Sequence, residues 1–332
     1  MTSRILMLSA VLALSTISWA QQTACKAIEI PVGVISSSGN VFRGLAAEDF
    51  TGHLQKKTVT VKAVTYDDGP RRVLIVVDAS KKLSADTRKA EAEMIQVLLA
   101  EARPEDTFGI MAARGPGQDV KFTADHAAIT QALNQAGDGR RGKDPGVLDT
   151  VMVGIEWFGP PQPGDSIVVI AADLEGNHKS NAKVVAKALA DNHIRMFGLA
   201  LGPVQTRSSV AGGTMTSTIS QGLAYTTPGV GDFVYDTGDE HFFPLTANSG
   251  GMVFGAMNGD SRHSYKIEDP RVLQAVRQKA SSVSKLIDSF YRMQVEPPAL
   301  SHPEDWTLEM NGEIQKNSQP MFVLYPRELG PC

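Results

Sequence analysis

The chain has 332 residues, of which 42% are hydrophobic, 36 are acidic and 32 are basic. These proportions are those of an ordinary globular protein, and the length is sufficient for one large domain or two with a buried core. The net charge of −4 excludes the strongly basic surface on which nucleic-acid binding depends, so we expect no nucleic acid as a partner.

Residues 1–20 have the pattern of a cleaved secretory signal peptide. A single cation, Arg4, precedes an apolar run that ends near Ile17, and Ala20 precedes Gln21 at the expected cleavage point. The run is shorter than the roughly 20 residues that a membrane-spanning helix needs. We therefore expect a secreted or periplasmic protein with no integral membrane segment after cleavage; an uncleaved anchor is the alternative.

Residues 21–70 are expected to form an N-terminal β segment. Apolar and polar residues alternate around Ile28 to Val34 and again around Val59 to Ala63, which is typical of half-buried strands.

From residue 71 to residue 290 apolar runs alternate with helical stretches. The run 73–77 is apolar throughout, which indicates a strand buried on both faces, and Ser84 is a candidate N-cap for a helix over 85–103. The other expected elements are strands at 107–113, 120–123, 166–171 and 195–201, and helices at 126–136, 147–158 and 181–192. This alternation predicts an α/β fold with a doubly wound, mainly parallel sheet flanked by helices.

A loop insertion is expected at 203–240, where Gly, Ser and Thr are frequent and no period is sustained. A short helix, a glycine turn and a strand are predicted over 244–254, followed by a long helix over 270–290. The segment 291–332 returns to short strands. We expect this C-terminal β segment to pack with the segment 21–70, so that both ends of the chain contribute small β elements.

The two cysteines, Cys25 and Cys332, lie close to the two ends of the mature chain. An oxidising compartment would permit a disulfide between them, which would close nearly the whole chain into a ring. Two unpaired thiols are the alternative, because the sequence does not give the geometry that a disulfide requires.

Polar residues follow two of the predicted strands. Ligands of an open parallel sheet bind outside the C-terminal ends of its strands, near the point where the strand order reverses; we call this edge of the sheet the top face. Asp78 and Ser80 follow the strand 73–77, and Asp173 follows the strand 166–171. If these two strands flank the reversal point, Asp78 and Asp173 face the same crevice.

Several short motifs recur in an order that points to a known family. Gly44-Leu45-Ala46-Ala47-Glu48-Asp49-Phe50 stands ahead of the main domain, Tyr66-Asp67-Asp68-Gly69-Pro70 precedes its first strand, and Ser249-Gly250-Gly251 forms a turn before a late strand. In order and spacing these motifs resemble the von Willebrand factor A (VWA) superfamily, most closely the bacterial secreted VWA-related proteins. The resemblance covers nearly the whole mature chain and implies a VWA or Rossmann-like fold.

The resemblance also implies a metal-ion-dependent adhesion site. In the family, Mg²⁺ is held by an Asp-x-Ser-x-Ser loop, a threonine from a second loop and an aspartate from a third. Asp78 and Ser80 match the first loop and Asp173 matches the third. However, Lys82 stands at the second serine position, and Pro145 stands at the threonine position.

These departures predict a degenerate site. The Lys82 ammonium group would repel Mg²⁺ and could neutralise the facing carboxylates, and proline has no side-chain oxygen. We therefore expect no cofactor, or weak binding of Mg²⁺ or Mn²⁺ with Asp144 as a replacement ligand if Lys82 points to solvent. Alternatively, Asp78, Ser80 and Asp173 only cap the turns or helices that follow them.

The resemblance and the signal peptide together imply a secreted, non-enzymatic protein-binding or adhesion module whose unidentified protein partner binds at the top face. Three aromatic residues of the insertion, Tyr225, Phe233 and Tyr235, are candidate contacts because aromatic side chains dominate interface hot spots. A floppy loop is the alternative. The sequence has neither a Gly-x-Ser-x-Gly nor a His-Glu-x-x-His motif, so no catalytic residue is expected. The alternative function is a metal-dependent hydrolase that uses the Asp78 and Asp173 crevice.

Overall fold

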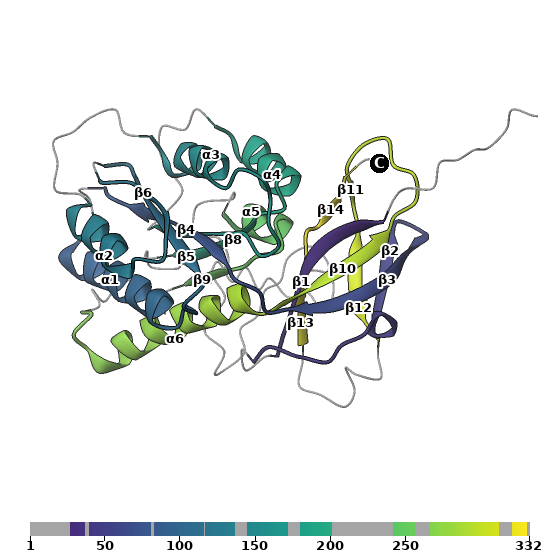
Figure 1. Ribbon diagram of the computed structural model, residues 1–332, viewed down its shortest axis with the longest axis horizontal. Coiled ribbons are helices and arrows are strands. Elements are labelled where there is room, and N and C mark those ends of the chain that lie inside the picture. Colours follow the sequence, from purple (N-terminus) through teal and green to yellow (C-terminus); the bar gives the residue numbers. More distant parts are fainter. Residues whose placement is uncertain are drawn as a thin grey trace, which may run out of the picture.

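The structure is a computed structural model, which describes residues 27–36, 40–80, 83–115, 117–136, 145–171, 180–200, 242–255, 266–311 and 321–330. In these ranges the chain forms two six-stranded sheets that lie side by side, one flanked by helices and one antiparallel, and a small two-stranded sheet (Figure 1). None of the helices in these ranges combines the length and the apolar composition needed to cross a bilayer.

The α/β layer is built on a sheet with the strand order β6-β5-β4-β7-β8-β9, in which every neighbouring pair is parallel except β5 and β6. Its strands are β4 (Arg72–Asp78), β5 (Thr107–Ala113), β6 (Val120–Thr123), β7 (Ser166–Ala171), β8 (Arg195–Ala200) and β9 (Val253–Gly255). The chain runs from β4 to β5 on one side and returns to β7 on the other. The strand order therefore reverses between β4 and β7, and the predicted mainly parallel sheet is confirmed.

Helices cover both faces of this sheet (Figure 1). Their bounds are α1 (Ala85–Ala100), α2 (His126–Gln135), α3 (Val147–Trp157), α4 (Ala182–Asp191), α5 (Phe242–Asn248) and α6 (Pro270–Asp288). Along β4, Val73, Ile75 and Val77 pack with α1, α2 and α6, whereas Leu74 and Val76 pack with α3, α4 and α5. The apolar run predicted to be buried on both faces is therefore the central strand of the core.

The second sheet is antiparallel, with the strand order β12-β2-β3-β10-β1-β13. Its strands are β1 (Ile28–Ser36), β2 (Phe50–Leu54), β3 (Lys57–Asp67), β10 (Phe290–Glu296), β12 (Thr307–Met310) and β13 (Met321–Leu324); the short strands β11 (Glu304–Asp305) and β14 (Glu328–Leu329) pair with each other. The edge strands β12 and β13 contact each other, so the sheet is nearly closed around its own core. We call this sheet the barrel.

The barrel is larger than the small β elements predicted from the sequence, and its strand β1 is not half-buried. The residues of β1 from Ile30 to Ser36 are all buried, because one side of the strand faces the barrel core and the other faces helix α6. Ile35 of β1 and Phe322 and Leu324 of β13 share a core cluster with Leu286 of α6. The two layers therefore share buried apolar surface.

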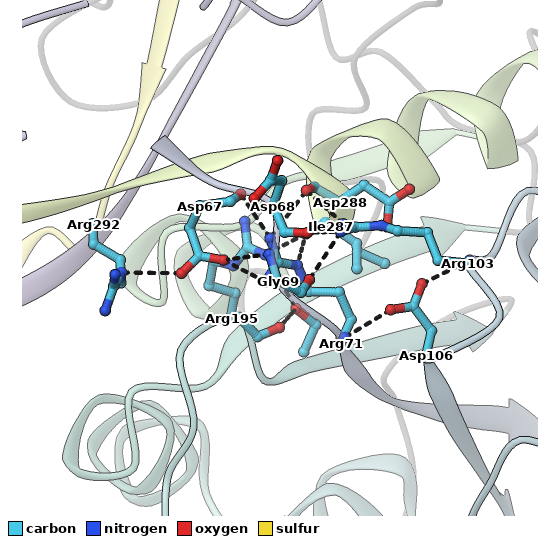
Figure 2. A network of polar contacts seen from close by, with 12 residues as sticks. Asp67, Asp68, Gly69, Arg71, Arg103, Asp106, Arg195, Ile287, Asp288 and Arg292 are labelled. Atoms are coloured by element: carbon cyan, nitrogen blue, oxygen red, sulfur yellow. Dashed lines mark hydrogen bonds and ion pairs between the residues drawn. The ribbon is translucent and has the colours of Figure 1, made fainter. Parts of the chain in front are cut away.

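A buried polar network joins the two layers at the N-terminal ends of the parallel strands (Figure 2). The guanidinium group of Arg71 donates to Asp67 Oδ1 at 2.7 Å and to the carbonyl oxygens of Ile287 and Asp288 at 3.1 and 3.0 Å. Arg195 donates to the Ile287 carbonyl at 2.9 Å. The last carbonyls of a helix lack partners within it, so the two arginines cap α6 where the chain passes into β10.

The electrostatics of this junction are dominated by burial. Burial, and then the charge of Arg71, lower the pKa of Arg195 to about 9. Burial alone would raise the pKa of Asp67, but hydrogen bonds from Arg71 and from the Gly69 amide, with the charges of Arg71 and Arg292, bring it below its ordinary value. Asp67 is therefore held as a carboxylate between the layers.

Candidate functional site

Asp78 is the last residue of β4 and lies at the centre of the top face, beside the point where the strand order reverses. Its side chain is only 1% exposed. One carboxylate oxygen, Oδ1, accepts a hydrogen bond from the Ser80 amide at 2.9 Å, and the other, Oδ2, lies 3.6 Å from Nη2 of Arg114. The aspartate thus caps the turn that follows it and forms an ion pair with an arginine from the next strand.

Arg114 is brought to Asp78 by the turn that ends β5. Its backbone is left-handed, with a φ of 59°, and its amide donates to the Pro145 carbonyl at 2.9 Å. The next residue, Gly115, passes so close to β4 that a Cβ atom there would lie 2.1 Å from the Ala79 carbonyl oxygen. Close packing of these two strand ends therefore fixes the guanidinium group beside the carboxylate.

A second carboxyl group lies under the same turn. Glu91 of α1 is 2% exposed, and its Oε1 accepts a hydrogen bond from the Asp78 amide at 3.2 Å. Burial, and then the nearby charge of Asp78, raise the pKa of Glu91 to about 8, although the charge of Arg88 opposes this change. Glu91 is therefore mainly protonated at neutral pH, and the described part of the site also contains two guanidinium groups, that of Arg114 and that of Arg88, which donates to the Ser80 carbonyl at 2.9 Å.

The structure describes only part of the predicted site. Asp78 and Ser80 lie together, and the backbone of Pro145 contacts Arg114, as given above. The other predicted residues fall outside the described ranges: Lys82, Asp144, Asp173, Tyr225, Phe233, Tyr235, Cys25 and Cys332. The strand that leads towards Asp173, β7, pairs directly with β4, as the prediction of a shared crevice requires.

Sequence reasoning missed Arg114 and Glu91. A signal for each was present: Arg114 directly follows an apolar strand at the top face, and Glu91 follows Ala90 on the side of α1 that carries Met94 and Leu98. A carboxyl group at a position with apolar neighbours at helical spacing is buried at a cost unless it is paired or protonated. Such residues mark candidate sites.

Among the described residues, Asp78 and Ser80 are the only predicted ligands with side-chain oxygens, whereas a tightly bound Mg²⁺ ion requires a near-octahedral set of oxygen ligands. Asp78 already caps a turn and pairs with a guanidinium group, and Pro145 supplies no side-chain oxygen. In the part of the chain that the structure describes, no group of three or more His, Cys, Asp or Glu side chains could hold a metal ion.

No protein-family model matches the chain, and no curated protein matches it. Among solved structures, an aerotolerance-related membrane protein from Bacteroides fragilis with multiple mutations to serine is 14% identical, with a TM-score of 0.45 over 66% of this chain and 99% of that one. The conserved hypothetical protein BatB from Bacteroides thetaiotaomicron is 17% identical, with a TM-score of 0.40 over 64% and 98% of the two chains. The VWA domain of SpRpn10 is 16% identical, with a TM-score of 0.34 over 41% and 78%.

At such TM-scores and identities these likenesses carry no information about function. The topology of the α/β layer can be judged by itself: a mainly parallel sheet, helices on both faces, and a strand order that reverses between β4 and β7. This is the architecture that the family resemblance implied. The α/β layer of the chain has the doubly wound topology that VWA and Rossmann-like folds share.

Proposed function

We propose that the chain is a non-enzymatic binding protein that contacts a protein partner through its top face without a tightly bound metal. The ion pair between Asp78 and Arg114 is the observation that carries this proposal. The guanidinium group of Arg114 would repel a divalent cation placed beside it. Arg114 thus takes the electrostatic role that the family gives to a metal ion.

The burial of the acidic groups supports binding rather than catalysis. Asp78 is 1% exposed and Glu91 is 2% exposed, so neither carboxyl group can reach a substrate unless the turn over them moves. We extend the proposal to direct contacts from the 203–240 insertion and to action outside the cytoplasm, which the pattern of residues 1–20 supports.

A metal titration tests the first part of the proposal. A ligand that binds only the folded state raises the melting temperature with its occupancy, so Mg²⁺ or Mn²⁺ should leave the wild-type melting temperature unchanged. The triple variant Arg114→Ser, Lys82→Ser and Pro145→Thr removes two basic side chains and restores the side-chain oxygens of the family. Its melting temperature should therefore rise when Mg²⁺ or Mn²⁺ is added. Arg271→Ala, at an arginine that is 92% exposed, is the matched control. A rise of several degrees in the wild type would contradict the proposal.

Partner capture tests the second part. Immobilised wild-type protein should retain a protein from secreted or periplasmic extract, and a variant that lacks residues 203–240 should not. Screens for esterase, phosphatase and peptidase activity with Mg²⁺ and Mn²⁺ address the hydrolase alternative. A metal-dependent activity that Asp78→Ala abolishes and Asp125→Ala preserves would replace the binding proposal with that alternative, since Asp125 only caps the start of α2.

A further inference from the structure

A cavity lies between the barrel and the α/β layer, far from the top face. It has a volume of about 350 Å³ and is lined by residues 28–31 of β1, by the loop 161–164, and by His193, Phe290 and Arg292. The loop leads into β7 and His193 leads into β8, so the cavity lies at the N-terminal ends of the parallel strands. The length of a strand therefore separates it from Asp78, and the two sites are independent.

The cavity reaches an open edge of β1. Four consecutive residues of the strand line the cavity. Side chains alternate between the two faces of a strand, and Ile30 points into the barrel core, so the cavity is lined by the backbone of the strand as well as by its side chains. One edge of β1 pairs with β10 from Ile28 to Val32, whereas the other edge pairs with β13 only from Gly33 to Ser36. Within the described residues, the second edge has no partner strand beside residues 28–32.

The backbone groups on this open edge can be assigned from the hydrogen-bond alternation of β1. The Val34 carbonyl and the Ser36 amide bond to Phe42 and Asn40, on the edge opposite β13. The backbone N–H and C=O groups of even-numbered residues therefore point towards that edge, and those of odd-numbered residues point towards the β13 edge. Pro31 has no amide proton, so the open edge beside the cavity presents the amide of Glu29 and the carbonyl oxygens of Glu29 and Pro31.

The opposite wall of the cavity is apolar and locked in place. The Gln162 amide donates to Asp165 Oδ2 at 2.8 Å, and the two side-chain oxygens of Asp165 accept hydrogen bonds from Arg72 at 2.8 and 2.6 Å. Pro161 and Pro163, on either side of Gln162, have no amide protons to offer. This wall therefore cannot pair with β1 and presents proline rings instead, while the buried ring of Phe290 also lines the cavity.

The rim of the cavity carries one acidic and one basic side chain, Glu29 and Arg292. The Glu29 side chain is 42% exposed, and its ion partner among the described residues is Arg292, with the two charged groups 3.9 Å apart. Arg292 lies closer to Asp67, at 3.0 Å. The pair with Arg292 is therefore long and exposed, so a basic side chain of a partner could form a closer ion pair with Glu29.

From these walls and charges we propose that the cavity is a peptide-binding groove, in which an extended segment of a partner protein pairs with the open edge of β1. Pairing would satisfy the Glu29 amide and the two carbonyl oxygens, as in other cases where a strand is added to a sheet. Side chains of an extended segment that are two residues apart share a face. A basic residue opposite Glu29 and an apolar residue two positions away, against the prolines, match the groove.

Synthetic peptides test this groove on the full chain. The probe is the acetylated and amidated peptide Thr-Lys-Thr-Val-Thr, and the comparison peptides replace its lysine by glutamate or its central threonine by proline. By calorimetry, the lysine peptide should bind at least about tenfold more tightly than either comparison peptide. In hydrogen exchange measured by NMR, the Glu29 amide should become protected only when the lysine peptide is bound.

A charge reversal distinguishes pairing at this edge from unspecific attraction. Glu29→Lys should reverse the preference so that the glutamate peptide binds more tightly. Glu296→Lys is the matched control, because Glu296 lies on the same sheet and is 44% exposed, and it should leave the preference unchanged. Three outcomes would each overturn the proposal: the Glu29→Lys variant binds the lysine and glutamate peptides equally, the wild type binds the lysine peptide without protection of the Glu29 amide, or the wild type does not bind it at millimolar concentration. Dimerisation through this edge, detected by sedimentation, would overturn it in favour of a second copy of the chain.

None of these measurements depends on the top face. Arg114→Ser should bind the lysine peptide as the wild type does, so the groove and the proposed function can fail separately.

Discussion

At the N-terminal ends of the parallel strands two buried arginines, Arg71 and Arg195, lie close to each other, whereas at the C-terminal ends two buried carboxyl groups, Asp78 and Glu91, lie together. The opposite balance has opposite electrostatic results. The arginine-rich junction lowers the pKa of Arg195 to about 9, and the acid-rich top face raises the pKa of Glu91 to about 8. In both places burial is the largest cause.

The difference lies in what compensates the surplus charge. At the junction, backbone carbonyls from the end of α6 accept hydrogen bonds from both arginines, and the charges of Asp67, Asp288 and Asp165 oppose the fall in the pKa of Arg195. At the top face the raised pKa of Glu91 means that this carboxyl group holds a proton. A cluster whose charged groups are hydrogen-bonded to the backbone has a structural role, whereas the charge of a cluster that holds an exchangeable proton changes with pH. The comparison therefore separates a structural network from a candidate site.

The largest effect is expected at the junction. Arg71→Ala would leave Asp67 and the end of α6 without their main donor, and removal of one partner from a buried ion pair costs about 3–5 kcal/mol of unfolding free energy. Urea unfolding of this variant, with Arg271→Ala as the exposed control, would measure the loss. A loss below about 1 kcal/mol would mean that the network does not join the layers.

A smaller and pH-dependent effect is expected at the top face. The ordinary pKa of a glutamate is 4.5 and that of Glu91 in the folded chain is about 8, so the folded state binds the extra proton between these values. The resulting stabilisation is fully present below pH 4.5 and is lost as the pH rises to about 8. Glu91→Gln keeps the neutral shape, so its stability relative to the wild type should increase over this range by about 1.4 kcal/mol per pH unit, which amounts to about 3 kcal/mol near pH 6.5.

Thermal unfolding of Glu91→Gln between pH 5 and pH 9 would measure this dependence, with the exposed Glu156→Gln as the control. Parallel pH profiles for the wild type and Glu91→Gln would show that Glu91 does not hold the proton, and the contrast between the two ends of the sheet would be lost.

The smallest effect is expected at a cap that belongs to neither cluster. The Ser84 hydroxyl accepts a hydrogen bond from the Thr87 amide at 3.1 Å and caps α1 in an exposed position. Ser84→Ala should cost about 1 kcal/mol at every pH, as other N-cap substitutions do. Urea unfolding at two pH values gives this baseline. A pH-dependent loss would show that α1 transmits the titration of Glu91 to its own start.

The pattern of apolar and polar residues within each segment was sufficient to predict most strands and helices of the α/β layer. The strands β5, β6 and β7 have the predicted bounds, and Ser84 caps α1 as predicted. Helix α1 ends at Ala100, three residues earlier than expected. The barrel was less predictable, because β3 and β10 are more than 200 residues apart in the chain and their register depends on the completed fold.

The site shows the same limit. Asp78 and Ser80 were found because they directly follow an apolar strand. Arg114 could be recognised as a partner only once β5 was known to lie beside β4, and Glu91 only once α1 was known to pack under the turn. Contacts that depend on strand order are not contained in any short segment.

The pairing of β1 with β10 has a consequence for how the chain is made. The strand β1 belongs to the first segment that the structure describes, yet its partner β10 is synthesised some 260 residues later. Until then β1 and one edge of β3 have no neighbouring strand, and such edges are sites of aggregation. A chain interrupted before residue 290 should therefore keep its parallel sheet strands but accumulate in insoluble form, whereas the complete chain can bury both edges in one step.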